Sequence, residues 1–151
     1  EVMEEFIHNS LLMKKKLIEI DEFDEGPRNV MNYGHSFGHA IESATNYTIP
    51  HGIAVTIGMD IANFIAAELN VSTSEHFERM HGVLDKNCSL FRHVDVELKL
   101  MLNALSKDKK NSATQLRLIL PNDEGHIKIG LYDNNVELIN ALEKYFDLYG
   151  G

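Results

Sequence analysis

The sequence is poor in several residue types that would point to particular classes of protein. It has one cysteine, no tryptophan and three prolines in 151 residues. The single Cys88 cannot form an internal disulfide, which favours a reducing compartment and argues against a secreted disulfide scaffold. The chain also lacks an apolar run long enough to span a bilayer and the basic-then-apolar order of a signal peptide. We therefore expect a cytoplasmic protein.

A surplus of basic residues is lacking too. Lys and Arg number 14 against 23 Asp and Glu, which gives a net charge of −9. Nonspecific binding to nucleic acid or to anionic lipid draws its free energy from a surplus of Lys and Arg. We therefore expect neither nucleic acid nor a membrane as a partner.

A nucleotide-binding turn is the third absence. No Gly-x-Gly-x-x-Gly segment follows a strand-like stretch. The chain begins with Glu1 inside a helical pattern, without an initiator methionine or a capping residue. We expect that residues 1–151 form one domain of a longer protein, whose other parts are not in this chain.

What is present is a series of apolar repeats at helical spacing, followed by one alternating segment. The alternating residues 114–121 and 126–130 flank the turn "NDEG", a pattern typical of a β hairpin. The fold class we expect is mainly α, a helical bundle with a small β hairpin. The expected helices cover residues 2–20, 35–44, 51–69, about 73–84, 96–106 and 135–147.

The segment "NYGHSFGHAIESATNYTIPHG" at residues 32–52 concentrates histidine and glycine. Residues four apart on a helix share a face, so His35 and His39 point the same way. His51 follows a turn and can fold back toward them. The spacing is that of the HExxH zinc motif, but Ser36 replaces its glutamate, which excludes that metalloprotease chemistry.

A purely structural role for these histidines is the alternative. Glycines beside them allow a substrate or a second helix to approach the backbone, which favours a functional site. Three imidazoles close together can hold a divalent metal or work jointly on a substrate. The remaining histidines stand singly in polar stretches and carry no such pattern: His8, His76, His81, His93 and His126.

An ordered series of motifs resembles the C-terminal domain of the 3-dehydroquinate synthase and sugar phosphate cyclase family. The series is "DEFDEGPRNVMNYGHSFGHAIE", then "HGIAVTIGM", then "KDKK" and "QLRLILP". The resemblance implies that His35 and His51 bind Zn²⁺ or another divalent metal. It further implies that His39 contacts the substrate and assists proton movement.

The same resemblance implies a set of cationic and polar substrate ligands. Lys14, Arg28 and Asn32 match positions that hold the substrate carboxylate and hydroxyls, and Lys109, or else Lys110, matches a lysine near the phosphate or carboxylate. The implied enzyme is a lyase of aromatic amino acid biosynthesis by the shikimate pathway. It acts on a phosphorylated sugar acid with NAD bound mainly by an N-terminal domain.

The chain also departs from the family pattern. The segment that supplies the family's third metal ligand, a glutamate, is absent, and Ile53 stands where the family has glutamate. We therefore expect the chain alone to be inactive. The alternatives are the C-terminal domain of a metal-dependent alcohol or glycerol dehydrogenase and a non-catalytic helical interaction module. The oligomeric state, monomer or homodimer, stays open.

Overall fold

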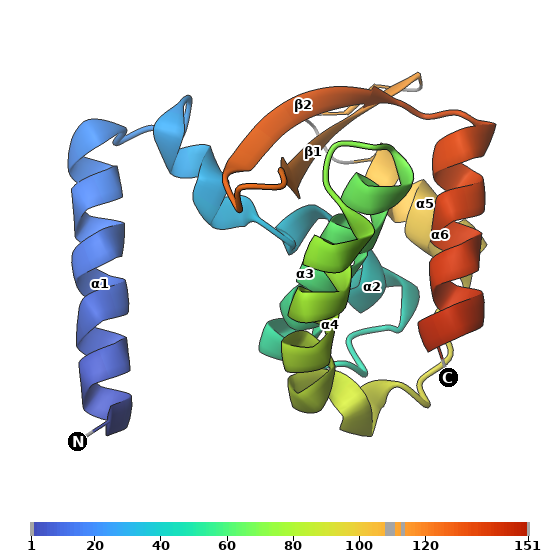
Figure 1. Cartoon of the computed structure of the whole chain (residues 1–151), viewed down its shortest axis with the longest axis horizontal. Helices are drawn as coiled ribbons and strands as arrows, with labels where there is room; N and C mark the ends of the chain where they lie inside the picture. The colour runs from blue at the N-terminus through green and yellow to red at the C-terminus, as the bar shows by residue number, and fades with distance from the viewer. Residues whose placement is uncertain (1, 108–110, 113, 151) are drawn as a thin grey trace. The chain divides into compact units, whose positions relative to one another are not determined.

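The computed structural model describes residues 2–107, 111–112 and 114–150. The chain divides into two compact units, Glu1–Met31 and Asn32–Gly151, each of which is described by itself. Mainly helical, with one antiparallel hairpin, the structure confirms the predicted fold class (Figure 1). In the described part of the chain no helix is long and apolar enough to cross a membrane.

The first unit consists of helix α1 (Val2–Ile20) and a turn that leads into the short 3-10 helix η1 (Pro27–Asn32). α1 confirms the helix expected over residues 2–20. The turn is built around Asp21, whose carboxylate accepts hydrogen bonds from the backbone N–H groups of Glu25, Gly26 and Arg28 at 3.0, 2.8 and 3.1 Å. These bonds satisfy backbone donors that would otherwise lack partners where a helix ends. The 3-10 helix was not expected, because Gly26 and Pro27 break the apolar spacing.

Two closely packed helices open the second unit, α2 (His35–Ala44) and α3 (His51–Glu68). A Cβ atom added to Gly58 of α3 would overlap the carbonyl oxygen of Gly34 and lie 2.7 Å from the Gly38 nitrogen. Gly34 has a φ of 78°, in the left-handed region that favours glycine. The helix backbones therefore touch at the glycines, and this contact holds the start of α2 beside α3.

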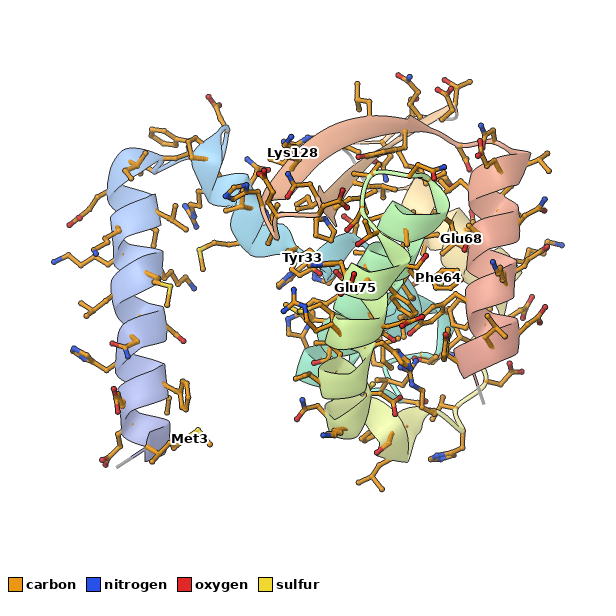
Figure 2. The ribbon with its side chains drawn as sticks, in the orientation of Figure 1. Met3, Tyr33, Phe64, Glu68, Glu75 and Lys128 are labelled. Carbon is orange, nitrogen blue, oxygen red and sulfur yellow. The ribbon has the colours of Figure 1, made fainter. Side chains whose placement is uncertain are left out.

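α3 is the central helix of the second unit. α4 (Ser74–Cys88) and α6 (Val136–Tyr149) pack against it, α5 (Leu98–Ser106) packs against α2, and the short 3-10 helix η2 (Ser89–Phe91) follows α4. The side chain of Phe64 on α3 is labelled in Figure 2. Its ring meets those of Phe77 and Tyr145 edge-on, with ring centroids 5.1 and 5.5 Å apart. The largest fully buried side chains are those of Phe37, Ile41, Ile49, Ile61, Ile65, Met101, Leu105, Leu116, Leu118, Leu120, Leu138 and Tyr145.

The hairpin consists of β1 (Gln115–Pro121) and β2 (Ile127–Asp133), paired antiparallel with Leu118 opposite Gly130. Leu118 and its neighbours two residues away on β1 are buried, so one side of the strand belongs to the core. The expected strands are confirmed, although β2 continues to Asp133. The sequence signal was lost there because Gly130 and the residues after it do not alternate.

Side-chain caps explain where the helices α4 and α6 begin. The Thr73 hydroxyl accepts a hydrogen bond from the His76 N–H at 3.2 Å, and the Asn135 side chain accepts one from the Leu138 N–H at 3.1 Å. Such caps satisfy donors of the first turn and stabilise a helix by about 1 kcal/mol. α5 begins at Leu98, two residues later than expected, because Val96 packs against the core from the preceding loop.

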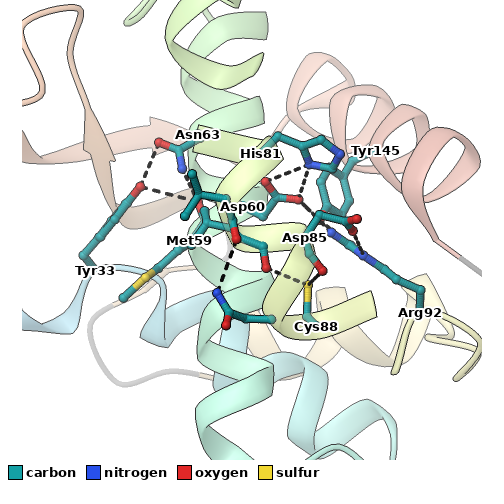
Figure 3. Close-up of polar contacts among 12 residues, drawn as sticks. Tyr33, Met59, Asp60, Asn63, His81, Asp85, Cys88, Arg92 and Tyr145 are labelled. Atoms are coloured by element: carbon teal, nitrogen blue, oxygen red, sulfur yellow. Dashed lines mark hydrogen bonds and ion pairs between the residues drawn. The ribbon is translucent and has the colours of Figure 1, made fainter. Parts of the chain in front are cut away.

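A polar network lies inside this apolar unit (Figure 3). The fully buried Asp60 of α3 accepts hydrogen bonds from His81 Nδ1 at 2.8 Å, from Arg92 at 2.9 Å and from the Tyr145 hydroxyl at 2.6 Å. Arg92 also donates to Tyr145 at 2.7 Å and to Asp85 at 3.0 Å. Burial raises the pKa of Tyr145 well above its ordinary value, and the Asp60 charge raises it further. The network joins α3, α4 and α6, so His81 is not an isolated surface histidine.

Candidate functional site

The candidate site lies where α2 and α3 begin. Gly34 precedes α2, and Pro50 precedes α3 with a φ of −59°, which is the value that proline favours. His35 is the first residue of α2 and His51 is the first residue of α3. Because the two helices pack closely at their glycines, side chains from both starts reach the same region.

The three histidines of the segment come together there. Their ring centroids are 5.6 Å apart for His35 and His39, 5.6 Å for His35 and His51, and 5.7 Å for His39 and His51. The rings of His39 and His51 are exposed, and that of His35 is half-buried. The cluster is therefore a surface feature that a ligand can reach, and the convergence expected from the spacing is present.

His35 is held in a definite protonation state. Its Nδ1 lies 3.3 Å from the carbonyl oxygen of Tyr33. A carbonyl can only accept, so Nδ1 carries the proton and Nε2 keeps its lone pair. Burial lowers the pKa of His35, and the nearby His39 and His51 lower it further, so the neutral ring prevails at neutral pH. Neutral imidazole is the form that binds Zn²⁺.

Glu42 belongs to the cluster, although the sequence analysis passed over it. One ligand atom each of His39, Glu42 and His51 lies within 4.8 Å of the other two, and Glu42 is buried. The Glu42 carboxylate meets His51 Nδ1 at 3.1 Å. Its sequence signal was available: it stands three residues after His39 and seven after His35, on the same face of α2.

The imidazoles of the cluster suit a divalent metal of the zinc type. Imidazole nitrogen is one of the ligands that Zn²⁺ commonly takes. His35 presents a free Nε2 for the reason given above, and the carboxylate beside His51 favours the same tautomer there. The residues present therefore fit the metal that the sequence resemblance implies.

A hollow of about 390 Å³ adjoins the cluster on the side of α5. His39 of α2 and Lys107, the residue that caps α5, line it together with Ser36 and Ser43. An ammonium group, a ring nitrogen and two hydroxyls suit a phosphate or carboxylate group. Lys107 was missed because its charge run "KDKK" resembles a solvated loop.

The other predicted substrate ligands are only partly placed by the structure. Asn32 is half-buried at the end of η1, just before the histidine segment. Lys14 lies exposed on α1, and the Arg28 guanidinium donates to the Glu22 carbonyl at 2.8 Å. Both residues belong to the first unit, Glu1–Met31. Lys109 and its alternative, Lys110, lie outside the described residues.

The fold is similar to that of two solved structures of 2-deoxy-scyllo-inosose synthase. The chain is similar to a solved 2-deoxy-scyllo-inosose synthase complexed with carbaglucose-6-phosphate, NAD⁺ and Co²⁺, with a TM-score of 0.66 and 23% identity over 80% of this chain and 35% of that chain. A second structure of 2-deoxy-scyllo-inosose synthase gives a TM-score of 0.61 at 24% identity over 79% of this chain and 34% of that chain. At these identities the likeness shows the fold.

Residues 1–111 match the family model for the C-terminal domain of 3-dehydroquinate synthase. The chain therefore belongs to the 3-dehydroquinate synthase family, which confirms the resemblance seen in its motifs. It is 32% identical over 146 residues to 3-dehydroquinate synthase of Helicobacter pylori strain P12, covering 96% of this chain and 43% of that protein. It is 35% identical over 147 residues to that of Sulfurovum sp. strain NBC37-1, covering 96% and 42%. The chain thus spans about two fifths of the length of these relatives.

Proposed function

We propose that this chain is the metal- and substrate-binding part of a 3-dehydroquinate synthase-like cyclase. The observation that carries the proposal is the meeting of His35, His39 and His51 from two successive helices, with ring centroids 5.6–5.7 Å apart. The family match and the order of the motifs support the same reaction. In it, a phosphorylated sugar acid loses phosphate and closes to a carbocycle.

In this proposal His35 and His51 hold the divalent ion through Nε2. When bound, the ion would polarise the substrate's alcohol and carbonyl oxygens. The solved 2-deoxy-scyllo-inosose synthase contains Co²⁺ and NAD⁺, which supports a divalent metal and NAD as cofactors. NAD would bind mainly to an N-terminal domain that this sequence does not include, and the chain alone would be inactive.

His39 is the residue proposed to move a proton on the substrate. It lies on the same helix as His35, its ring centroid is 5.7 Å from that of His51 on α3, and it also lines the hollow beside Lys107. An imidazole ring can accept a proton at one nitrogen and release one from the other, which suits general acid–base catalysis.

The charge distribution agrees with an anionic substrate. The net charge is −9, but distant charges on the surface are screened within about 8 Å at physiological ionic strength. A local group of cations therefore decides which ligand binds. Lys14, Arg28, Asn32 and Lys109 are proposed to hold the carboxylate, hydroxyls and phosphate, and Lys107 adds a cation to the hollow beside His39.

A zinc titration of the chain tests the proposal. With two imidazole ligands, we expect binding at least about tenfold weaker than when the NAD-binding half completes the site. His35→Ala or His51→Ala should each weaken zinc binding further. The matched control is His126→Ala, which removes an exposed histidine that also faces a carboxylate, that of Glu124. Absence of zinc uptake with the NAD-binding half present would instead support a non-catalytic interaction module.

A further inference from the structure

Two histidine–glutamate pairs of the chain have the same length but different surroundings. His51 Nδ1 lies 3.1 Å from Glu42, and His126 Nδ1 lies 3.1 Å from Glu124. The Glu42 side chain is only 10% exposed, whereas that of Glu124 is 74% exposed. Water competes freely for the second pair and has little access to the first carboxylate.

A buried carboxylate restricts its partner ring to one tautomer. An ionised carboxylate has only acceptor atoms, so the imidazole nitrogen that faces it must carry a proton. In His51 that nitrogen is Nδ1, which leaves the Nε2 lone pair for another ligand. The His51 side chain is 58% exposed, so a ligand can reach the ring from solvent.

The backbone fixes where Glu42 and His51 meet. A Cβ atom added to Gly38 of α2 would lie 2.9 Å from the Cα of Val55, one turn into α3. Helices in such close contact cannot slide past each other without a clash. Glu42, one turn beyond Gly38 on α2, is therefore held beside the first residue of α3.

We propose that Glu42 is a positioning residue that holds His51 as the Nδ1-protonated tautomer and aims its Nε2 at the divalent ion. The metal part of this inference rests on the proposed function. Histidines that bind metals commonly donate their other ring N–H to a carboxylate, and loss of such a partner typically costs 10–100-fold in metal affinity. Glu42 acts through the ring and is not itself a ligand of the ion.

The first experiment needs no metal. Long-range ¹H–¹⁵N NMR of the metal-free 151-residue chain, recorded where the ring ¹⁵N shifts no longer change with pH, reports which ring nitrogen of His51 is protonated. We expect the Nδ1–H form in the wild type and in Glu42→Gln, whose amide oxygen still accepts the bond. Glu42→Met keeps the volume without an acceptor, and its His51 ring should become a mixture of tautomers. Glu124→Met, the control, should leave the His51 signals unchanged.

The second experiment measures zinc affinity in the same variants by competition with a chromophoric chelator. We expect Glu42→Met to bind zinc roughly 10–100-fold more weakly and Glu42→Gln to stay within a few-fold of the wild type. A loss in Glu42→Gln as large as that in Glu42→Met would overturn the inference, since it would mark Glu42 as a direct ligand. An unchanged His51 tautomer in Glu42→Met would overturn it too.

The two experiments separate this inference from the proposed function. If the tautomer of His51 depends on Glu42 but the wild type binds no zinc, even with the NAD-binding half, the positioning of the ring stands and the proposed function fails. If the wild type binds zinc but the tautomer ignores Glu42, the proposed function stands and this inference fails.

Discussion

Helix α3 takes part in two histidine–carboxylate pairs, one at its start and one at its middle. It supplies the histidine of the first pair and the carboxylate of the second, and the surroundings of the two pairs differ. At the start, Glu42 meets His51, whose ring is 58% exposed. At the middle, the carboxylate of Asp60 is fully buried and meets His81, Arg92 and Tyr145. The same chemical pair is thus open to a ligand in one place and enclosed by protein partners in the other.

The difference teaches how to separate a structural network from a binding site. A buried carboxylate with three donors has its charge compensated, so further ligands gain little from it. A carboxylate that fixes one exposed ring leaves that ring with a free nitrogen facing solvent. Burial alone does not distinguish the two regions, because both carboxylates are buried. What distinguishes them is the exposure of the partner ring, which is 58% for His51 and 21% for His81.

The largest expected effect comes from breaking the enclosed network. Asp60→Ala leaves the Arg92 guanidinium, only 15% exposed, beside Tyr145 without its buried counter-charge. Removing one partner of a buried ion pair typically costs 3–5 kcal/mol. We expect a loss of about that size in the free energy of unfolding, measured by urea denaturation. The matched variant Glu42→Gln should cost about 1 kcal/mol or less, and equal losses in both would remove the contrast between the regions.

A second expected effect concerns the contact that brings α2 to α3. Gly58→Ala places a methyl group against the carbonyl oxygen of Gly34 and 2.7 Å from the Gly38 nitrogen. Overpacking of this kind costs about 1–3 kcal/mol. It should also move the histidine rings apart and weaken zinc binding, while the network around Asp60 keeps its packing.

The control for this variant lies on the same helix. A Cβ atom added to Gly52 meets nothing within 4 Å. Gly52→Ala should therefore be neutral or stabilise the helix by about 0.5–1 kcal/mol. If both alanine variants behave alike in thermal unfolding, close helix contact is not what assembles the histidines.

The third prediction concerns the Tyr33 hydroxyl, which connects the start of the histidine segment to α3 by a hydrogen bond. It donates to Asn63 Oδ1 at 2.8 Å, and burial raises the pKa of Tyr33 to about 12. The ordinary value is about 10, so the unfolded chain loses this proton first. The stabilisation is fully present below about pH 10 and is lost as the pH rises through about 12.

Tyr33→Phe removes both the bond and this dependence on pH. At neutral pH we expect a loss of about 1 kcal/mol, the usual size for one hydrogen bond. Between about pH 10 and 12 the variant should lose stability less steeply than the wild type in urea denaturation. Parallel curves for the two proteins would show that another group governs alkaline unfolding.

Local signals made most of the fold predictable from the sequence. The acidic segment with its glycine and proline at residues 21–28 follows α1 directly, and Thr73 caps α4, so these boundaries follow from residues close in the chain. The histidines of the candidate site were found in the same way, from a spacing of four residues on one helix. Their roles as ligands and catalyst stay predictions.

Long-range contacts were not predictable in this way. Asp60 stands in an apolar run, and its partners Arg92 and Tyr145 are far along the chain, so no pattern joins them. Glu42 was not singled out from the sequence. It is buried only because α3 packs over its face of α2, which depends on the tertiary fold. The sequence therefore showed the exposed residues of the site better than the residue that orients one of them.

The smallest expected effect on stability belongs to the open pair and completes the comparison. His51→Ala removes a ring that is 58% exposed, so we expect it to change the free energy of unfolding by at most about 1 kcal/mol while it weakens zinc binding. His81→Ala removes a ring that is 21% exposed and takes one donor from Asp60, which should cost about 1–3 kcal/mol without touching zinc binding. We therefore expect His81→Ala to lower mainly the stability and His51→Ala to lower mainly the zinc affinity. A zinc loss in His81→Ala as large as that in His51→Ala would mean that the two regions of α3 are coupled, because the buried network would then be setting the geometry of the exposed cluster.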